Sequence, residues 1–157
     1  MMTSYDDFRT RVVATTIDGT TLLSTDYFNI FNEVTMLLGM LPDMPEMLED
    51  IAAWRFRSYA EHFRDSGLPF APLAIEAYAQ VPPTTRERFE ETIAQLRATI
   101  DEARETLSRL AREPGLDRFK LSALDYAARL QALLDTGSAI VHGAGEVSDQ
   151  SAIDAMF

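Results

Sequence analysis

The stretch FEETIAQLRATIDEARETLSRL, residues 89–110, decides the fold class of this chain. Its apolar positions recur at alternating spacings of four and three, which is the period of one face of an α-helix. Pro82 and Pro83 stop whatever precedes this stretch, and Thr84 with Glu87 three residues later is typical of a capping-box start. We therefore expect one long helix over residues 84–113. Its apolar seam is Phe89, Ile93, Leu96, Ile100, Ala103, Leu107 and Leu110.

A second apolar seam follows after a short Pro114-Gly115 turn. Because only this turn separates the two segments, the helices should pack antiparallel as a long helical hairpin over residues 84–136. The second seam is Leu116, Phe119, Ala123, Tyr126, Leu130 and Leu133, widened by Leu124, Ala127, Ala128 and Leu134. The hairpin predicts an all-α fold in which it is the dominant element.

The first 83 residues consist of shorter pieces. Asp18-Gly19 lies between two β-branched runs, residues 12–17 and 20–23, and this pattern predicts a small N-terminal β-hairpin. Helical periodicity follows over residues 26–41 and 47–54, then from a Ser58–Glu61 capping box to Ser66, and over 72–80. We expect these helices to pack on the hairpin and complete a helical bundle domain over residues 1–136.

Composition excludes several classes of function. The chain has 157 residues, 46% of them hydrophobic, which is enough for one domain with a genuine core. It contains no cysteine, so disulfides and thiolate chemistry are excluded. A net charge of −11 disfavours binding to nucleic acid or to an anionic membrane. No apolar run is long enough to span a membrane and no signal segment is visible, so we expect a cytoplasmic protein.

The last twenty-odd residues differ in character from the rest. Residues 137–148 are rich in glycine and serine and predict a flexible linker. Residues 149–157 form a short amphipathic segment in which Ile153, Met156 and Phe157 would project together from one helical turn, with nothing after them to cover them. So short a helix needs a docking partner to be ordered. The sequence therefore predicts a partner-binding tail.

The tail resembles a known peptide. Gln150, Ile153, Asp154 and Ala155, followed by Met156 and Phe157, are similar to the peptide of the flagellar switch protein FliM that binds the chemotaxis response regulator CheY. The order of long helical hairpin, linker and tail is similar to the chemotaxis phosphatase CheZ. This resemblance implies a signalling protein that binds a CheY-like response regulator and promotes its dephosphorylation. Ala152 and Asp149 depart from the FliM peptide, which has an acid and a serine there.

The resemblance to CheZ also implies an acid and a glutamine four residues apart on the second hairpin helix, where the amide orients the attacking water. That helix offers only Asp125 and Gln131, six apart and on different faces. Glu91 and Gln95 on the first helix have the required spacing and lie outside the apolar seam, although exposed helix positions commonly hold both residue types. No cofactor of its own is expected, since the metal ion would belong to the partner receiver domain.

Other interpretations stay open. The chain could be a non-enzymatic helical adaptor or structural protein whose tail caps its own bundle or a symmetry mate, and the long seam favours a homodimer. Glu61, His62 and Asp65 could form part of a metal site, although two histidines in the chain are few for one. Five aromatic residues could line a pocket between helices, but core packing is the commoner role: Trp54, Tyr59, Phe63, Phe70 and Tyr78.

Overall fold

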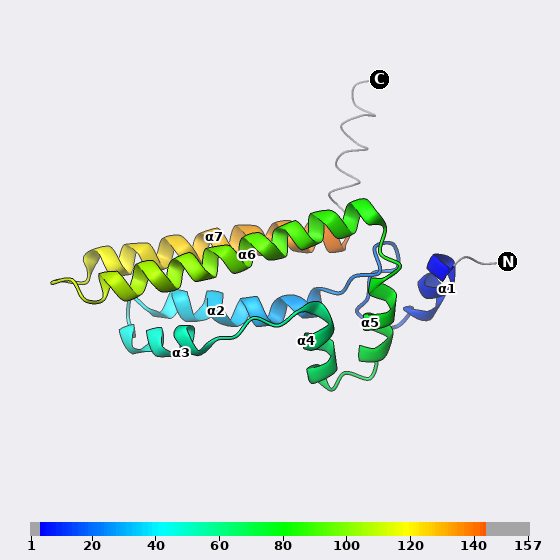
Figure 1. Ribbon diagram of the computed structural model, residues 1–157, viewed down its shortest axis with the longest axis horizontal. Coiled ribbons are helices and arrows are strands. Elements are labelled where there is room, and N and C mark those ends of the chain that lie inside the picture. The colour runs from blue at the N-terminus through cyan, green and yellow to red at the C-terminus, as the bar shows by residue number, and fades with distance from the viewer. Residues whose placement is uncertain (1–3, 144–157) are drawn as a thin grey trace, which may run out of the picture. The chain divides into compact units, whose positions relative to one another are not determined.

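The computed structural model describes residues 4–143, and no strand occurs in this range. Its α-helices are α1 (Ser4–Arg11), α2 (Asn29–Met40), α3 (Leu48–Ala53), α4 (Tyr59–Ser66), α5 (Ala71–Tyr78), α6 (Pro83–Leu110) and α7 (Asp117–Val141), with 3₁₀ turns η1 (Thr25–Phe28) and η2 (Pro45–Met47) (Figure 1). The all-α class is confirmed. None of these helices is both long and apolar enough to cross a membrane.

The chain forms two compact units, each built from segments that are distant in sequence. Within the described range, the first unit contains residues 4–27, 57–91 and 136–143. The second contains residues 28–56 and 92–135. Helices α6 and α7 each contribute one part to each unit.

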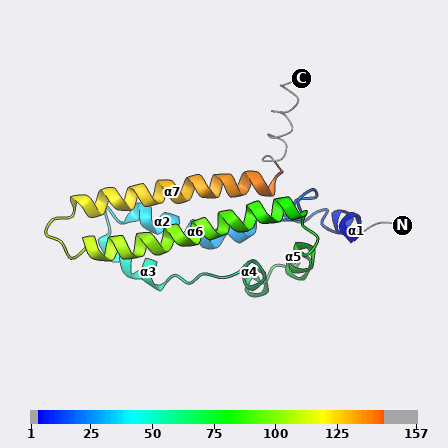
Figure 2. The same ribbon diagram turned by 45° about the horizontal axis from the view of Figure 1, so that its top comes forward.

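In the second unit, α6 and α7 lie side by side (Figures 1 and 2). The Arg129 guanidinium pairs with Glu102 at 2.9 Å, and the Tyr126 hydroxyl donates to Thr106 Oγ1 at 3.1 Å. Higher numbers on one helix meet lower numbers on the other, so the two segments are antiparallel within this unit. The full predicted hairpin, residues 84–136, extends beyond this unit and stays a prediction.

Most predicted seam positions that belong to the second unit are buried, whereas Leu116 and Leu124 of the second seam are 38% and 49% exposed. Leu96, Ile100 and Leu107 of α6 have no measurable exposure, and neither has Leu130 of α7. Helix α2 buries the broad face that its sequence predicted. The buried side chains of this unit from α2, the segment after it and α3 are Ile30, Phe31, Val34, Leu37, Leu38, Leu41, Ile51 and Trp54.

The boundaries of α6 differ slightly from those expected. The helix begins at Pro83, so the predicted capping box at Thr84 is wrong and Thr84 lies inside the first turn. Proline suits this first position because its fixed φ is already helical and it lacks only an N–H that would be unpaired there. The helix ends at Leu110, and the next residues turn with Glu113 N–H donating to the Leu110 carbonyl at 3.1 Å.

The predicted N-terminal β-hairpin is wrong. The only pairing around it is one isolated bridge between Ile17 and Ser24. The Asp18 side chain accepts the N–H groups of Thr20 and Thr21 at 2.8 and 3.0 Å, and Leu22 adopts a positive φ of 64°. The Asp18 carboxylate thus replaces ladder hydrogen bonds with a local turn, as short acidic side chains often do.

Helix α1 was not expected, because it has no apolar period and buries no residue. Polar contacts hold it within the first unit. The Tyr5 hydroxyl donates to the Thr20 carbonyl at 2.5 Å, and Arg9 Nε donates to the Gly19 carbonyl at 2.9 Å. Arg11 pairs with Glu76 of α5 at 3.3 Å. These contacts tie the helix to the turn that replaces the β-hairpin.

The predicted linker begins too early. Helix α7 continues through Gly137 to Val141, and both of these residues are buried. The Thr21 hydroxyl donates to the Val141 carbonyl, and Gly143 with a φ of 76° closes the end of the helix. Tertiary packing therefore outweighs the poor helix propensity of glycine. The rest of the predicted linker and the whole tail, residues 144–157, lie outside the described residues.

Aromatic rings form the core of the first unit. Tyr27, Tyr59 and Phe89 pack edge to face or tilted, with ring centroids 5.3 to 6.1 Å apart, and Phe63 and Tyr78 each lie 4.8 Å from Tyr59. Burial raises the pKa of Tyr59 strongly, so its hydroxyl stays protonated and accepts the Ser24 N–H at 3.0 Å. Four of the five predicted aromatic residues belong to this unit, whereas Trp54 belongs to the other.

The Ser58–Glu61 capping box of α4 is confirmed. The Ser58 hydroxyl accepts the Glu61 N–H at 3.2 Å, and the Glu61 carboxylate accepts the Ser58 N–H at 2.9 Å. These bonds to Ser58 lower the pKa of Glu61. Two of the amide groups that a helix start leaves without intrahelical partners are therefore satisfied.

We predict that Ser58→Ala lowers the free energy of unfolding by about 1 kcal/mol, because it leaves the Glu61 N–H without its acceptor. Chemical denaturation followed by circular dichroism would measure the change. Ser108→Ala, at an exposed site in α6, is the matched control and should change stability by less than about 0.5 kcal/mol. Equal effects of the two substitutions would contradict a capping role for Ser58.

Candidate functional site

The predicted catalytic residues of α6 are both exposed. Glu91 and Gln95 lie four residues apart in this uninterrupted helix, and the side chain of each faces solvent. Glu91 belongs to the first unit and Gln95 to the second. The Gln95 carbonyl accepts the Thr99 hydroxyl at 2.8 Å, an ordinary contact one helical turn away. Their catalytic role stays a prediction.

The predicted residues of α7 are also exposed, but they do not form a pair. Asp125 and Gln131 are six positions apart in a regular helix, which places their side chains on different faces. The Gln131 amide donates to Asp135 at 3.0 Å, one turn further along the helix. The Gln131 amide therefore has its partner on the same helix, which is common for side chains on a solvent-exposed helix surface.

The predicted partner-binding residues lie outside the described range. These are Gln150, Ile153, Asp154, Ala155, Met156 and Phe157. Their proposed role rests on sequence alone.

The alternative metal site is not assembled. The His62 ring nitrogen Nε2 lies 2.9 Å from Asp26 Oδ2, so this histidine pairs with a residue other than Glu61 or Asp65. His62 is largely buried against the rings of Tyr27 and Phe63. Among residues 4–143, no cluster of three or more histidine, aspartate or glutamate side chains is arranged to hold a metal ion.

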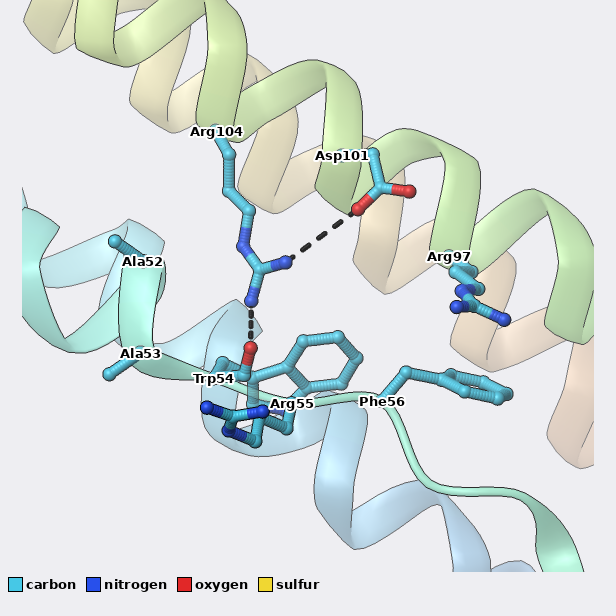
Figure 3. A pocket seen from close by; sticks show the side chains of 8 residues that line it. All are labelled: Ala52, Ala53, Trp54, Arg55, Phe56, Arg97, Asp101 and Arg104. Atoms are coloured by element: carbon cyan, nitrogen blue, oxygen red, sulfur yellow. Dashed lines mark hydrogen bonds and ion pairs between the residues drawn. The ribbon is translucent and has the colours of Figure 1, made fainter.

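The second unit contains a pocket of about 500 Å³ that combines arginine and aromatic side chains (Figure 3). Its walls come from the end of α3, from the extended segment that follows, and from α6. The lining residues are Ala52, Ala53, Trp54, Arg55, Phe56, Arg97, Asp101 and Arg104. Three arginines and one aspartate thus meet in a chain whose net charge is −11.

Arg104 holds the wall of this pocket in place. Its Nε donates to the Ile51 carbonyl at 3.1 Å, and its Nη2 donates to the Trp54 carbonyl, as the dashed line in Figure 3 shows. Its Nη1 lies 3.6 Å from Asp101, and its guanidinium lies over the Trp54 ring at 5.2 Å from the ring centre. These carbonyls stand at the C-terminus of α3, where a cation also interacts favourably with the helix dipole.

Trp54 anchors the same wall from the other side. Its backbone leaves the helix in an extended conformation, φ −60° and ψ 136°, and the residue is only 8% exposed. The indole N–H donates to the Ile30 carbonyl of α2 at 2.7 Å. The segment after Trp54 is therefore fixed by two independent sets of hydrogen bonds before any ligand arrives.

Arg97 and Arg55 are the cationic groups that the pocket leaves available. The Arg97 guanidinium lies over the Phe56 ring, 4.2 Å from its centre, a cation–π contact that orients it. Neither Arg97 nor Arg55 has an ion-pair partner within residues 4–143, and both are exposed. Asp101, the acid of the pocket, is paired with Arg104.

Sequence reasoning missed this pocket, although two signals were present. Arg97, Asp101 and Arg104 follow a helical spacing of four and three, which places them on one face of α6. The run Trp54-Arg55-Phe56-Arg57 alternates aromatic and basic side chains within an acidic part of the chain. Their meeting in space depends on how α3 and α6 pack, and that packing is not visible in either pattern.

Comparison with known proteins gives no match for this chain. No protein-family model matches the chain, and no curated protein and no solved structure is significantly similar to it.

We predict that Arg104→Lys lowers the free energy of unfolding by about 2 kcal/mol, since a lysine keeps the charge but cannot reach two carbonyls and Asp101 in one fork. Fluorescence of Trp54, the single tryptophan of the chain, would report both the unfolding and a change in the pocket. Arg112→Lys is the matched control at an exposed site of the same unit. If Arg104→Lys left the free energy of unfolding unchanged, the hydrogen bonds of Arg104 would not be what holds the pocket wall in place.

Proposed function

We propose that this protein is a signalling protein of the chemotaxis or flagellar type that binds a CheY-like response regulator through its C-terminal peptide. One observation carries the proposal: the sequence of the tail, Gln150 to Phe157, with its resemblance to CheY-binding peptides. The tail combines an acid, Asp154, with three large apolar side chains, a composition that suits a groove on a folded partner. The helical body supplies the scaffold that carries it.

Dephosphorylation of the bound regulator is the second part of the proposal. Water would attack the phosphorus of the regulator's aspartyl phosphate, and the bond from phosphorus to the aspartate oxygen would break. Inorganic phosphate, which keeps the protons of the water, would leave, and the regulator's aspartate carboxylate would be regenerated. The regulator's own metal ion would stabilise the developing charge, so a helper needs only to orient the water. The exposure of Gln95 on α6 supports its amide as the group that orients the water, and Glu91 is exposed as well.

For binding, we predict that the full-length protein prefers a CheY-like receiver activated with beryllofluoride. Ile153→Ala or Phe157→Ala should each weaken binding on the order of 30-fold, because anchor residues of an interface typically contribute about 2 kcal/mol or more. Fluorescence anisotropy of a labelled receiver would measure this. Met36→Ala, which removes a side chain 60% exposed in α2, is the control and should bind normally. If the protein bound no receiver from its own organism, the proposal would be wrong and the adaptor interpretation would remain.

For catalysis, we predict that the full-length protein accelerates loss of the acyl phosphate and that Gln95→Ala abolishes the acceleration without weakening receiver binding. Glu105→Ala is the matched control, since it removes an exposed polar side chain of the same helix and unit that is not a candidate catalytic residue. Release of inorganic phosphate from a labelled receiver is the measurement. If the Gln95→Ala and Glu105→Ala proteins act alike, Gln95 is not the helper group, while binding through the tail would stand.

A further inference from the structure

We propose that the arginine–aromatic pocket of the second unit, formed by Trp54, Arg55, Phe56, Arg97 and Arg104, binds an acidic peptide segment of a partner protein. This proposal does not depend on binding of a response regulator. Four properties of the pocket support it: its charge, its preformed wall, the arrangement of its two available arginines, and the residue types that line it.

Charge is the first argument. The chain as a whole carries eleven excess negative charges, which disfavour an acidic ligand almost everywhere on its surface. The pocket reverses this sign locally, because Arg55 and Arg97 lack ion-pair partners among residues 4–143 and Asp101 is paired with Arg104. An acidic ligand would therefore be attracted to this place and repelled from most others, so the charge pattern confers specificity as well as affinity.

The wall of the pocket is fixed in advance. Arg104 holds the Ile51 and Trp54 carbonyls, and the Trp54 indole is bonded to the Ile30 carbonyl at 2.7 Å. The contact with Phe56 restrains the Arg97 guanidinium, whose N–H edge stays available to a carboxylate. Because these groups are already held in place, ligand binding would cost less conformational entropy than it does at a flexible site.

The two available arginines do not converge on one point. Figure 3 shows Arg55 beside Trp54 and Arg97 over the Phe56 ring, so the two guanidinium groups lie near opposite ends of the Trp54–Phe56 segment. A single compact anion would engage one guanidinium and leave the other unused. An extended ligand with two separated carboxylates and an apolar group between them would engage both arginines, and an acidic peptide has this form.

The residue types also favour a protein partner. Arginine, tryptophan and other aromatic residues dominate the energetic centres of protein interfaces. A nucleic acid would also supply separated anions, but its continuous phosphate backbone would be repelled by a surface with a net charge of −11. The exposed alanines Ala52 and Ala53 leave room for a peptide backbone beside the arginines.

Selection of a displayed library of random 12-residue peptides against the full-length protein would test the proposal. We expect the enriched peptides to contain at least two acidic residues flanking an aromatic or aliphatic one. The synthesised peptides should change the fluorescence of Trp54, which lies in the pocket wall, and their affinity should fall as salt is raised.

Two double variants with the same change in net charge complete the test. Arg55→Glu with Arg97→Glu should weaken peptide binding at least about tenfold. Arg112→Glu with Lys120→Glu changes exposed cations of the same unit outside the pocket and should bind like the wild type. Circular dichroism of both proteins would verify that they are folded.

Three results would overturn the proposal. The selection could enrich no peptide or only peptides without acids, or the two double variants could bind the enriched peptides equally well. The third concerns the protein's own sequence, because Gly145–Phe157 is also acidic and apolar. If the synthetic peptide Gly145–Phe157 bound the pocket as tightly as the enriched peptides, the occupant would be this protein's own tail instead of a partner protein.

Discussion

The apolar seam of α6 is the constraint on which the second unit depends. Leu96, Ile100 and Leu107 are completely removed from solvent, and burial of each such side chain stabilises a fold by roughly 1.5–3 kcal/mol. Because this face is buried, the rotation of α6 about its own axis is fixed. The positions of Arg97, Asp101 and Arg104 on the neighbouring face follow from that rotation, because side chains three and four apart share a helix surface. Core packing and pocket chemistry are therefore two consequences of one helical register.

Arg104 links this register to the short helix α3. A helix end leaves its last carbonyls without intrahelical donors, and a buried carbonyl without a donor costs about 1–3 kcal/mol. The guanidinium satisfies two of these carbonyls, at Ile51 and Trp54, from a different helix. The same hydrogen bonds, which satisfy the last carbonyls of α3, also fix the start of the extended Trp54–Phe56 segment beside Arg97. The pocket is thus a by-product of how α3 is terminated, which explains why its wall is rigid although it consists partly of extended chain.

The features that could be predicted from sequence are those decided within a few turns of one element. The seam of α6, the periodic face of α2 and the Ser58–Glu61 capping box depend on local spacing, and all three occur as expected. The features that were missed depend on distant partners. Asp18-Gly19 looks like a hairpin turn, but the Asp18 carboxylate bonds to two amides of its own loop. Gly137 looks like a linker residue, but the Thr21 hydroxyl and the burial of Val141 carry α7 past it. The arginine pocket needs residues 52–56 and 97–104 together, and no local pattern joins them.

The candidate sites differ in the same way. Glu91, Gln95 and the tail are candidates because of their spacing and order along the chain. Glutamate and glutamine four residues apart are common on exposed helix surfaces, so this spacing does not by itself indicate a function. The pocket was recognised by what its side chains do to one another: one guanidinium is fully engaged, one is oriented on a ring, and the acid between them is paired. Such an arrangement leaves two exposed arginines without ion-pair partners among residues 4–143 in an acidic protein, and an anionic ligand would find few other positive places on its surface. The tail sequence carries acidic and apolar groups, and the pocket carries basic and aromatic ones, so the two are complementary. An acidic partner peptide in the pocket would therefore have to bind more tightly than the protein's own tail, because both offer carboxylates and apolar groups to the same arginines.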